Sequence, residues 1–152
     1  MDEFYKQLEA VCSVDNNVTL LANASALLNQ FFSDINWVGF YLYSGGKLVL
    51  GPFQGKVACT TIEIGKGVCG TAFQKKMLTN VADVHQFAGH IACDSASNSE
   101  IVIPIHRAGE LYGVLDIDSP VLERFDDDDK AGLELVVTTL ETTLDSLCEQ
   151  MF

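Results

Sequence analysis

The chain has 152 residues, of which 48% are hydrophobic and 20% are charged, and its formal net charge is −12. These values predict a single domain over residues 1–152 with a core of its own. The negative charge argues against nucleic acid or an anionic membrane as partner, because both require a basic surface, whereas a zwitterionic small ligand is compatible. No run of about 18 apolar residues occurs and the acidic start is no signal peptide, so we expect a cytoplasmic location.

Helical periodicity marks both ends of the chain, and strands lie between them. Apolar residues at helical spacing predict helices over 2–13, 17–32 and 126–149. Alternating and aromatic segments predict a hairpin of 36–43 with 47–51, and a third strand over 58–64. The acidic run at the start of the last helix fits a helix N-terminus, where the dipole favours negative charge.

The middle of the chain is less regular. We expect a short helix over 71–77, an extended segment over 78–84, a polar loop over 85–99, and two strands within 100–119. This order predicts an α+β fold, with a central, mainly antiparallel sheet flanked by the N- and C-terminal helices. Pro104 cannot donate a ladder hydrogen bond, so we expect it at an edge or an irregular position.

A glycine-rich loop, "IGKGVCGTAF" (64–73), contains the spacing of a dinucleotide-binding turn. Asp83 follows Gly65 by 18 residues, which half fits that site, but no strand-helix-strand unit surrounds it. The alternative is a tight turn before a short helix, with glycines chosen for their backbone freedom. Either interpretation puts Cys69 at a helix N-terminus, which favours a thiolate.

Five cysteines are many for a reducing compartment, and the odd number argues against a structural disulfide framework. Cys12 and Cys148 fall on predicted helices and are interpreted as inert, buried thiols. Cys59, Cys69 and Cys93 lie within 35 residues of one another. Cys93 belongs to the polar loop, where reactive groups are often displayed, and nearby cysteines can capture a sulfenic acid as a disulfide.

Metal binding is the alternative for this loop. His85, His90 and Cys93 could act as ligands, but their spacing matches no familiar zinc pattern. We therefore expect no metal.

Acidic and aromatic residues alternate along two predicted strands. In "GVLDIDS", Asp116 and Asp118 share one face, and in "NWVGFYLY" Trp37, Tyr41 and Tyr43 share one face. The two aspartates are either solvent-facing at a strand end or enclosed. If they are enclosed, mutual repulsion raises the pKa of one of them, and a carboxylic acid that can donate a proton at neutral pH results.

Four segments resemble one known family, the free methionine-(R)-sulfoxide reductases, which are built on a GAF domain. They are "GPFQGKVAC", "GKGVCGTA", "DVHQFAGHIACDSASNSEIVIPI" and "GVLDIDSP". The resemblance covers roughly residues 20 to 145, and the spacing of Cys59, Cys69 and Cys93 is specific to this family among GAF domains. It implies a six-stranded antiparallel sheet flanked by helices, often in a dimer.

The resemblance also implies roles for individual residues. Cys93 is similar to the attacking cysteine, and Cys59 and Cys69 to the cysteines that resolve its oxidised form. Glu100, Asp116 and Asp118 match acidic residues of the substrate pocket, and Trp37 and Tyr41 match the aromatics that line it. Either of Cys59 and Cys69 could form the first disulfide, and any of the three acids could be the proton donor.

The implied reaction reduces free methionine sulfoxide, with thioredoxin as the reductant and no cofactor. Selectivity for the R epimer follows from the resemblance alone. Two alternatives stay open at this point: a ligand-sensing GAF module without turnover, and a peroxide sensor that uses the same thiols.

Overall fold

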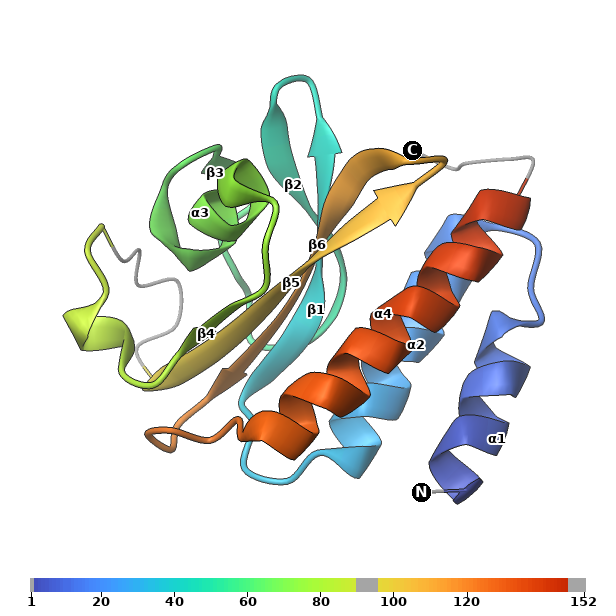
Figure 1. Ribbon diagram of the computed structural model, residues 1–152, viewed down its shortest axis with the longest axis horizontal. Helices are drawn as coiled ribbons and strands as arrows, with labels where there is room; N and C mark the ends of the chain where they lie inside the picture. Colours follow the sequence, from blue (N-terminus) through green and yellow to red (C-terminus); the bar gives the residue numbers. More distant parts are fainter. Residues whose placement is uncertain (1, 90–95, 148–152) are drawn as a thin grey trace.

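Six strands form one sheet in the order β3-β2-β1-β6-β5-β4, with every recorded pair antiparallel, in a computed structural model that describes residues 2–89 and 96–147. The predicted α+β class is therefore confirmed. Helices α2 and α4 cover one face of the sheet, α1 packs against these two helices, and α3 lies on the other face (Figure 1). The bounds are α1 Asp2–Cys12, α2 Asn17–Phe31, β1 Trp37–Ser44, β2 Lys47–Gly55, β3 Thr61–Glu63, α3 Gly67–Lys75, β4 Thr79–Val81, the 3-10 turn η1 Val84–Gln86, β5 Ser99–Arg107, β6 Glu110–Ser119 and α4 Asp127–Ser146.

Several predicted boundaries are wrong: the second hairpin strand, expected over 47–51, continues to Gly55. Glycine geometry explains the error at the start of α3. The third strand covers only 61–63 instead of 58–64, and α3 begins at Gly67 rather than at Thr71. Gly67 has a φ of 62°, which suits glycine and turns the chain into the helix. Gly70 lies so close to the Glu63 carbonyl that a Cβ would collide with it. The glycine spacing thus serves a tight turn, and the antiparallel sheet contains no dinucleotide-binding unit among the described residues.

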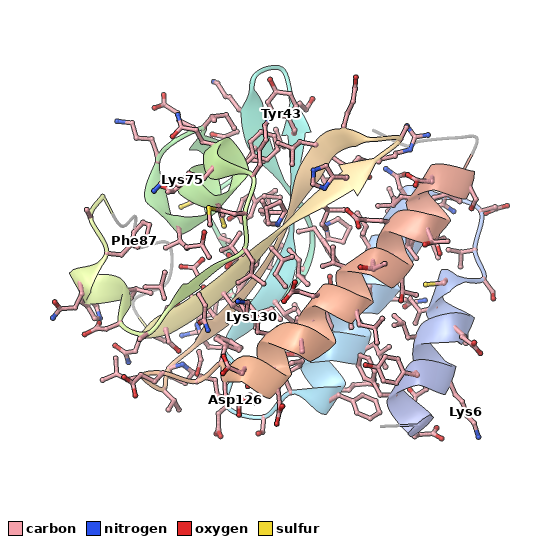
Figure 2. All side chains as sticks on the ribbon, in the orientation of Figure 1. Lys6, Tyr43, Lys75, Phe87, Asp126 and Lys130 are labelled. Carbon is pink, nitrogen blue, oxygen red and sulfur yellow. The ribbon has the colours of Figure 1, made fainter. Side chains whose placement is uncertain are left out.

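The face under α1, α2 and α4 holds the larger hydrophobic core. Val38, Phe40 and Leu42 of β1 point into it, together with leucines of α2 and α4. Both long helices begin at side-chain caps. Asn16 accepts from the Thr19 backbone, and Asp126 forms a capping box, so the acidic run is confirmed as a helix start. Figure 2 shows Asp126 at the beginning of α4.

The opposite face brings the predicted polar residues into rows across β1, β6 and β5. Trp37 is opposite Asp118, which in turn is opposite Glu100. In the next row, Gly39 is opposite Asp116. Directly opposed residues of antiparallel strands share a face, so the aromatic ring and the three acids meet on one surface.

Pro104 lies where β5 has lost one of its neighbours. It is opposite Val114 of β6, but β4 pairs only with residues 100–102 of β5. The edge position expected for this proline is therefore confirmed.

Candidate active site

A pocket lies on the face of the sheet that carries α3. Its walls come from β1, β3, β5, β6, the start of α3 and the segment after β2. The lining residues are Trp37, Tyr41, Val57, Ala58, Ile62, Lys66, Gly67, Val68, Cys69, Ser97, Glu100, Asp116 and Asp118. The sequence pattern did not indicate the contributions of Val57, Ile62, Lys66 and Ser97, since their place depends on how α3 and the loops fold over the sheet.

The three acids are enclosed rather than solvent-facing. Glu100, Asp116 and Asp118 are 7%, 5% and 9% exposed, so the solvent-facing interpretation of the two aspartates is wrong. One oxygen of Asp116, Oδ1, is buried without a hydrogen-bond partner among the described residues. An unpaired buried oxygen costs free energy, so a ligand that donates a hydrogen bond to it or brings a positive charge would be bound favourably.

The acids change one another's proton affinity. Burial, followed by the charges of Asp116 and Asp118, raises the pKa of Glu100 well above its usual range. Burial also raises the pKa of Asp116, but hydrogen bonds with Glu100, Cys69 and Asp118 oppose that rise. Of these two carboxyl groups, Glu100 is therefore the more favoured to hold a proton, with Asp116 accepting its hydrogen bond.

Cys69 sits in the first turn of α3, only 3% exposed, with Sγ 3.9 Å from Glu100 Oε2. Burial raises the pKa of this thiol well above its usual range, and the charges of Asp116, Glu100 and Asp118 add to the effect. The thiolate expected from the helix N-terminus is therefore wrong. Desolvation and nearby negative charges outweigh the roughly half positive charge of a helix end.

Cys59 differs from Cys69 in its oxidation state. It is disulfide-bonded, and because Cys12 and Cys69 are both free thiols, neither is its partner. Cys93 and Cys148, like His90, lie outside the described residues. His85 belongs to the turn η1, where its Nε2 lies 3.0 Å from Asn98 Oδ1.

Aromatic side chains form one wall and also hold the Cys59 segment. Trp37 stacks on Tyr41 and on Phe53, at centroid distances of 5.9 and 5.2 Å. The indole Nε1 donates to the Lys56 carbonyl at 3.2 Å, and the Tyr41 hydroxyl donates to the Cys59 carbonyl at 2.9 Å. Burial, then the charge of Asp116, raises the pKa of Tyr41, so the hydroxyl keeps its proton.

Two further residues of β1 define the extent of this wall. Gly39 has no room for a side chain, because a Cβ there would meet Phe53 and the Trp37 ring. The glycine thus lets these two rings stack above β1. Tyr43 does not line the pocket: it is 48% exposed, stacks on Phe73 at 5.0 Å, and lies at the far end of the β1–β2 hairpin (Figure 2).

One group of side chains could hold a metal ion. Single ligand atoms of Cys69, Glu100 and Asp116 all lie within 4.8 Å of one another, and all three residues are buried. The same three groups could instead surround a polar substrate atom and exchange a proton with it.

Comparison with known proteins identifies the class of domain. The family model of the GAF domain matches residues 14–144, so the chain belongs to the GAF family.

None of the helices in residues 2–89 and 96–147 combines the length and the apolar character that a membrane span requires.

Within the GAF family, the chain is similar to several free methionine-R-sulfoxide reductases. The chain is 56% identical over 124 residues to the free methionine-R-sulfoxide reductase of Escherichia coli, covering 82% of this chain and 75% of that protein. Two solved structures are also similar. One is fRMsr of Staphylococcus aureus in complex with substrate (TM-score 0.88, 51% identity, 94% of each chain). The other is the free methionine-R-sulfoxide reductase of Neisseria meningitidis in complex with its substrate (TM-score 0.89, 42% identity, 93% and 86% of the chains). The resemblance stated from the sequence is confirmed.

Proposed function

We propose that this protein reduces free L-methionine-(R)-sulfoxide to methionine. The observation that carries the proposal is the enclosure of Glu100, Asp116 and Asp118 beside Cys69, under an aromatic wall. A sulfoxide oxygen must be protonated before it can leave sulfur, and a buried acid that keeps its proton supplies that need. The similarity to reductases solved with their substrates supports the choice of substrate.

The reaction begins with Cys93 as the attacking thiolate, a role that rests on the resemblance. Its sulfur attacks the sulfoxide sulfur, and the oxygen takes a proton. The sulfoxide S–O bond and the new sulfur–sulfur bond then break, the oxygen with its proton bonds to the Cys93 sulfur as a sulfenic acid, and methionine leaves. The sulfoxide sulfur gains two electrons and the Cys93 sulfur loses two, so the step is balanced without a cofactor.

Glu100 is our candidate for the proton donor. Its raised pKa favours the protonated form, whereas Asp116 is stabilised as an acceptor by the hydrogen bonds it receives. Asp116 and Asp118 keep the donor's proton affinity high, because their charges oppose its ionisation. Trp37 and Tyr41 provide the apolar surface against which the sulfur and its methyl group can pack.

Cys59 is our candidate for the first resolving cysteine. Its thiol would condense with the sulfenic acid of Cys93, forming a disulfide and releasing water. What supports this choice is that Cys59 is disulfide-bonded while Cys69 is a free thiol. Cys69 is then available for a later thiol–disulfide exchange.

A dithiol protein of the thioredoxin type would restore the enzyme by exchange with that disulfide. We place the protein in the cytoplasm, where such a reductant is available, and propose a homodimer as its assembly. Neither nucleic acid nor membrane is a proposed partner, given the net charge of −12.

Selectivity for the free amino acid would follow from charge. A free amino acid carries an ammonium group that peptide-bound methionine lacks, and the acidic pocket can pair with it. A peptide form would leave those buried acids without a partner. The R epimer would be favoured because only one configuration aims its oxygen at the acids while its sulfur meets the thiol.

The test is NADPH consumption with thioredoxin, thioredoxin reductase and free methionine-R-sulfoxide. We expect turnover by the wild type and no methionine release by Cys93→Ser, even in a single turnover without thioredoxin. Cys12→Ser is the matched control, since this free thiol lies on α1, outside the pocket lining.

Three outcomes would contradict the proposal. Unchanged methionine release by Cys93→Ser would mean that another cysteine attacks. Binding of a small molecule without NADPH consumption would indicate a sensing module, and consumption driven by peroxide but not by the sulfoxide would indicate a peroxide sensor.

A further inference from the structure

Three potential metal ligands converge from three different elements of the fold. Cys69 comes from the first turn of α3, Glu100 from β5 and Asp116 from β6. One ligand atom of each lies within 4.8 Å of the other two. Because β5 and β6 are paired and α3 packs on them, the backbone itself holds this arrangement, and no loop has to close to form it.

One oxygen of the cluster also lacks a partner among the described residues. Asp116 is 5% exposed and its Oδ1 has no hydrogen-bond partner among the described residues. Over residues 2–89 and 96–147, no ion pair with Glu100 or Asp116 is recorded; the two recorded pairs join His106 to Glu141 and Arg124 to Asp129. Buried carboxylates without a cation are normally protonated, hydrogen-bonded or bound to a metal.

We propose that this cluster binds a thiophilic divalent cation such as Zn²⁺, through Cys69 Sγ and one oxygen each of Glu100 and Asp116. The ion would occupy the space beside the acids at which the sulfoxide oxygen is proposed to point. It would therefore inhibit the reductase reversibly. The inhibition rests on the proposed function, whereas the binding does not.

The distances suit zinc. Zinc binds thiolate sulfur at about 2.3 Å and carboxylate oxygen at about 2.0–2.2 Å, so a tetrahedral site separates these ligands by about 3.5 Å. Cys69 Sγ and Glu100 Oε2 are 3.9 Å apart, and all three ligand atoms lie within 4.8 Å of one another. Side-chain shifts of about 1 Å therefore bring the three atoms to zinc-binding distances. Three protein ligands leave the fourth position for water, or for Asp118, which lines the same pocket.

The ligand set selects among cations. Mg²⁺ and Ca²⁺ prefer an all-oxygen shell with six or more ligands, and a thiolate does not suit them. Zn²⁺ accepts sulfur and oxygen together with only four ligands. The bound ion would also neutralise the negative charges that face one another in the pocket.

Direct metal titration tests the proposal without any substrate. Co²⁺ serves as the probe, because a cobalt–thiolate bond gives a charge-transfer band in the near ultraviolet and a tetrahedral site gives strong visible bands. We expect both bands in the wild type, loss of the charge-transfer band in Cys69→Ser, and affinity for Zn²⁺ at least about tenfold weaker in Asp116→Asn. Cys12→Ser should match the wild type.

Two further arms separate this proposal from the proposed function. Cys59→Ser should bind Co²⁺ like the wild type even though it cannot complete the thioredoxin cycle, since Cys59 is not a ligand. Free methionine sulfoxide should displace the ion and reduce the bands. A charge-transfer band that persists in Cys69→Ser, or no thiolate band in the wild type, would overturn the metal site. Bands unchanged by saturating sulfoxide would overturn the shared position.

Discussion

Both faces of the sheet bury strand side chains, but the two faces use them differently. On the face under α2 and α4, Val38 and Phe40 are completely buried among apolar side chains. On the other face, Trp37 is almost as well buried, at 3% exposed, but its neighbours across the sheet are Asp118 and Glu100. Enclosure alone therefore does not define a core, since the same strands can support stability on one side and proton chemistry on the other.

The covering elements explain the difference. The long helix α4 supplies a continuous stripe of leucines and valines, whereas the short helix α3 supplies Cys69 and a glycine-rich turn. A helix of 20 residues, about five and a half turns, can exclude water along the whole length of the strands that it covers. A nine-residue helix and its loops leave a pocket, and the polar groups that line it remain accessible to a ligand.

The largest expected effect is on the pocket side. Glu100→Gln keeps the shape of the side chain but removes the proposed proton donor, so we expect the rate of methionine release to fall by about 10²–10⁴-fold. Single-turnover kinetics with rapid quenching measure it. Glu63→Gln on the exposed part of β3 is the matched control, and an unchanged rate in Glu100→Gln would remove Glu100 from the chemistry.

On the helix-covered side, Phe40→Ala should act on stability. Phe40 is fully buried, so its truncation should lower the free energy of unfolding by about 3–5 kcal/mol. Urea denaturation measures the loss, with Leu135→Ala as the control because Leu135 is 49% exposed on α4. A loss below about 1 kcal/mol would mean that this face is not packed as described.

The dependence of stability on pH distinguishes the faces again. Glu100 has an ordinary pKa of 4.5 and a raised one in the folded protein, so the folded state holds a proton that the unfolded chain releases. Its stabilising contribution is complete below about pH 4.5 and is lost as the pH rises toward the folded pKa. We therefore expect the free energy of unfolding of Glu100→Gln, relative to that of the wild type, to be higher at about pH 7 than at about pH 5. Urea denaturation at both pH values tests this expectation, and a constant difference would contradict the raised pKa.

A smaller effect should come from the link between the wall and Cys59. Tyr41→Phe keeps the ring but removes the hydrogen bond to the Cys59 carbonyl, which is worth about 0.5–1.5 kcal/mol. We expect disulfide formation to slow by up to about tenfold while methionine release in a single turnover stays near the wild-type rate. Tyr43→Phe, on an exposed tyrosine, is the control. Equal slowing of both steps would mean that Tyr41 acts on the pocket as a whole.

The sequence predicts which strand residues share a face better than it predicts what covers that face. Alternation in β1 and β6 assigned Trp37, Tyr41, Asp116 and Asp118 to a common surface, and the helical stripes located α2 and α4. These patterns depend on local periodicity, which the chain displays directly.

What covers the second face could not be predicted in the same way. Whether Asp116 is enclosed depends on α3 folding across the sheet, which no period along β6 encodes. The same contact buries Cys69 against the acids and reverses the proton affinity expected from its position in a helix. The start of α3 was also hidden, because glycines disfavour helices in general and are needed here for the turn and the approach to Glu63.

The alternation along β6 has a consequence for how reliably the protein assembles. Leu115 and Ile117 point to one face of the sheet, while Asp116 and Asp118 point to the other. A register shift of one residue would place the two carboxylates in the hydrophobic core and move the two aliphatic side chains out of it. Such a misaligned molecule could not compete with the native one. The register that buries the apolar side chains of β6 therefore also places its two acids in the pocket, so correct folding of the sheet and correct assembly of the site depend on the same strand alignment.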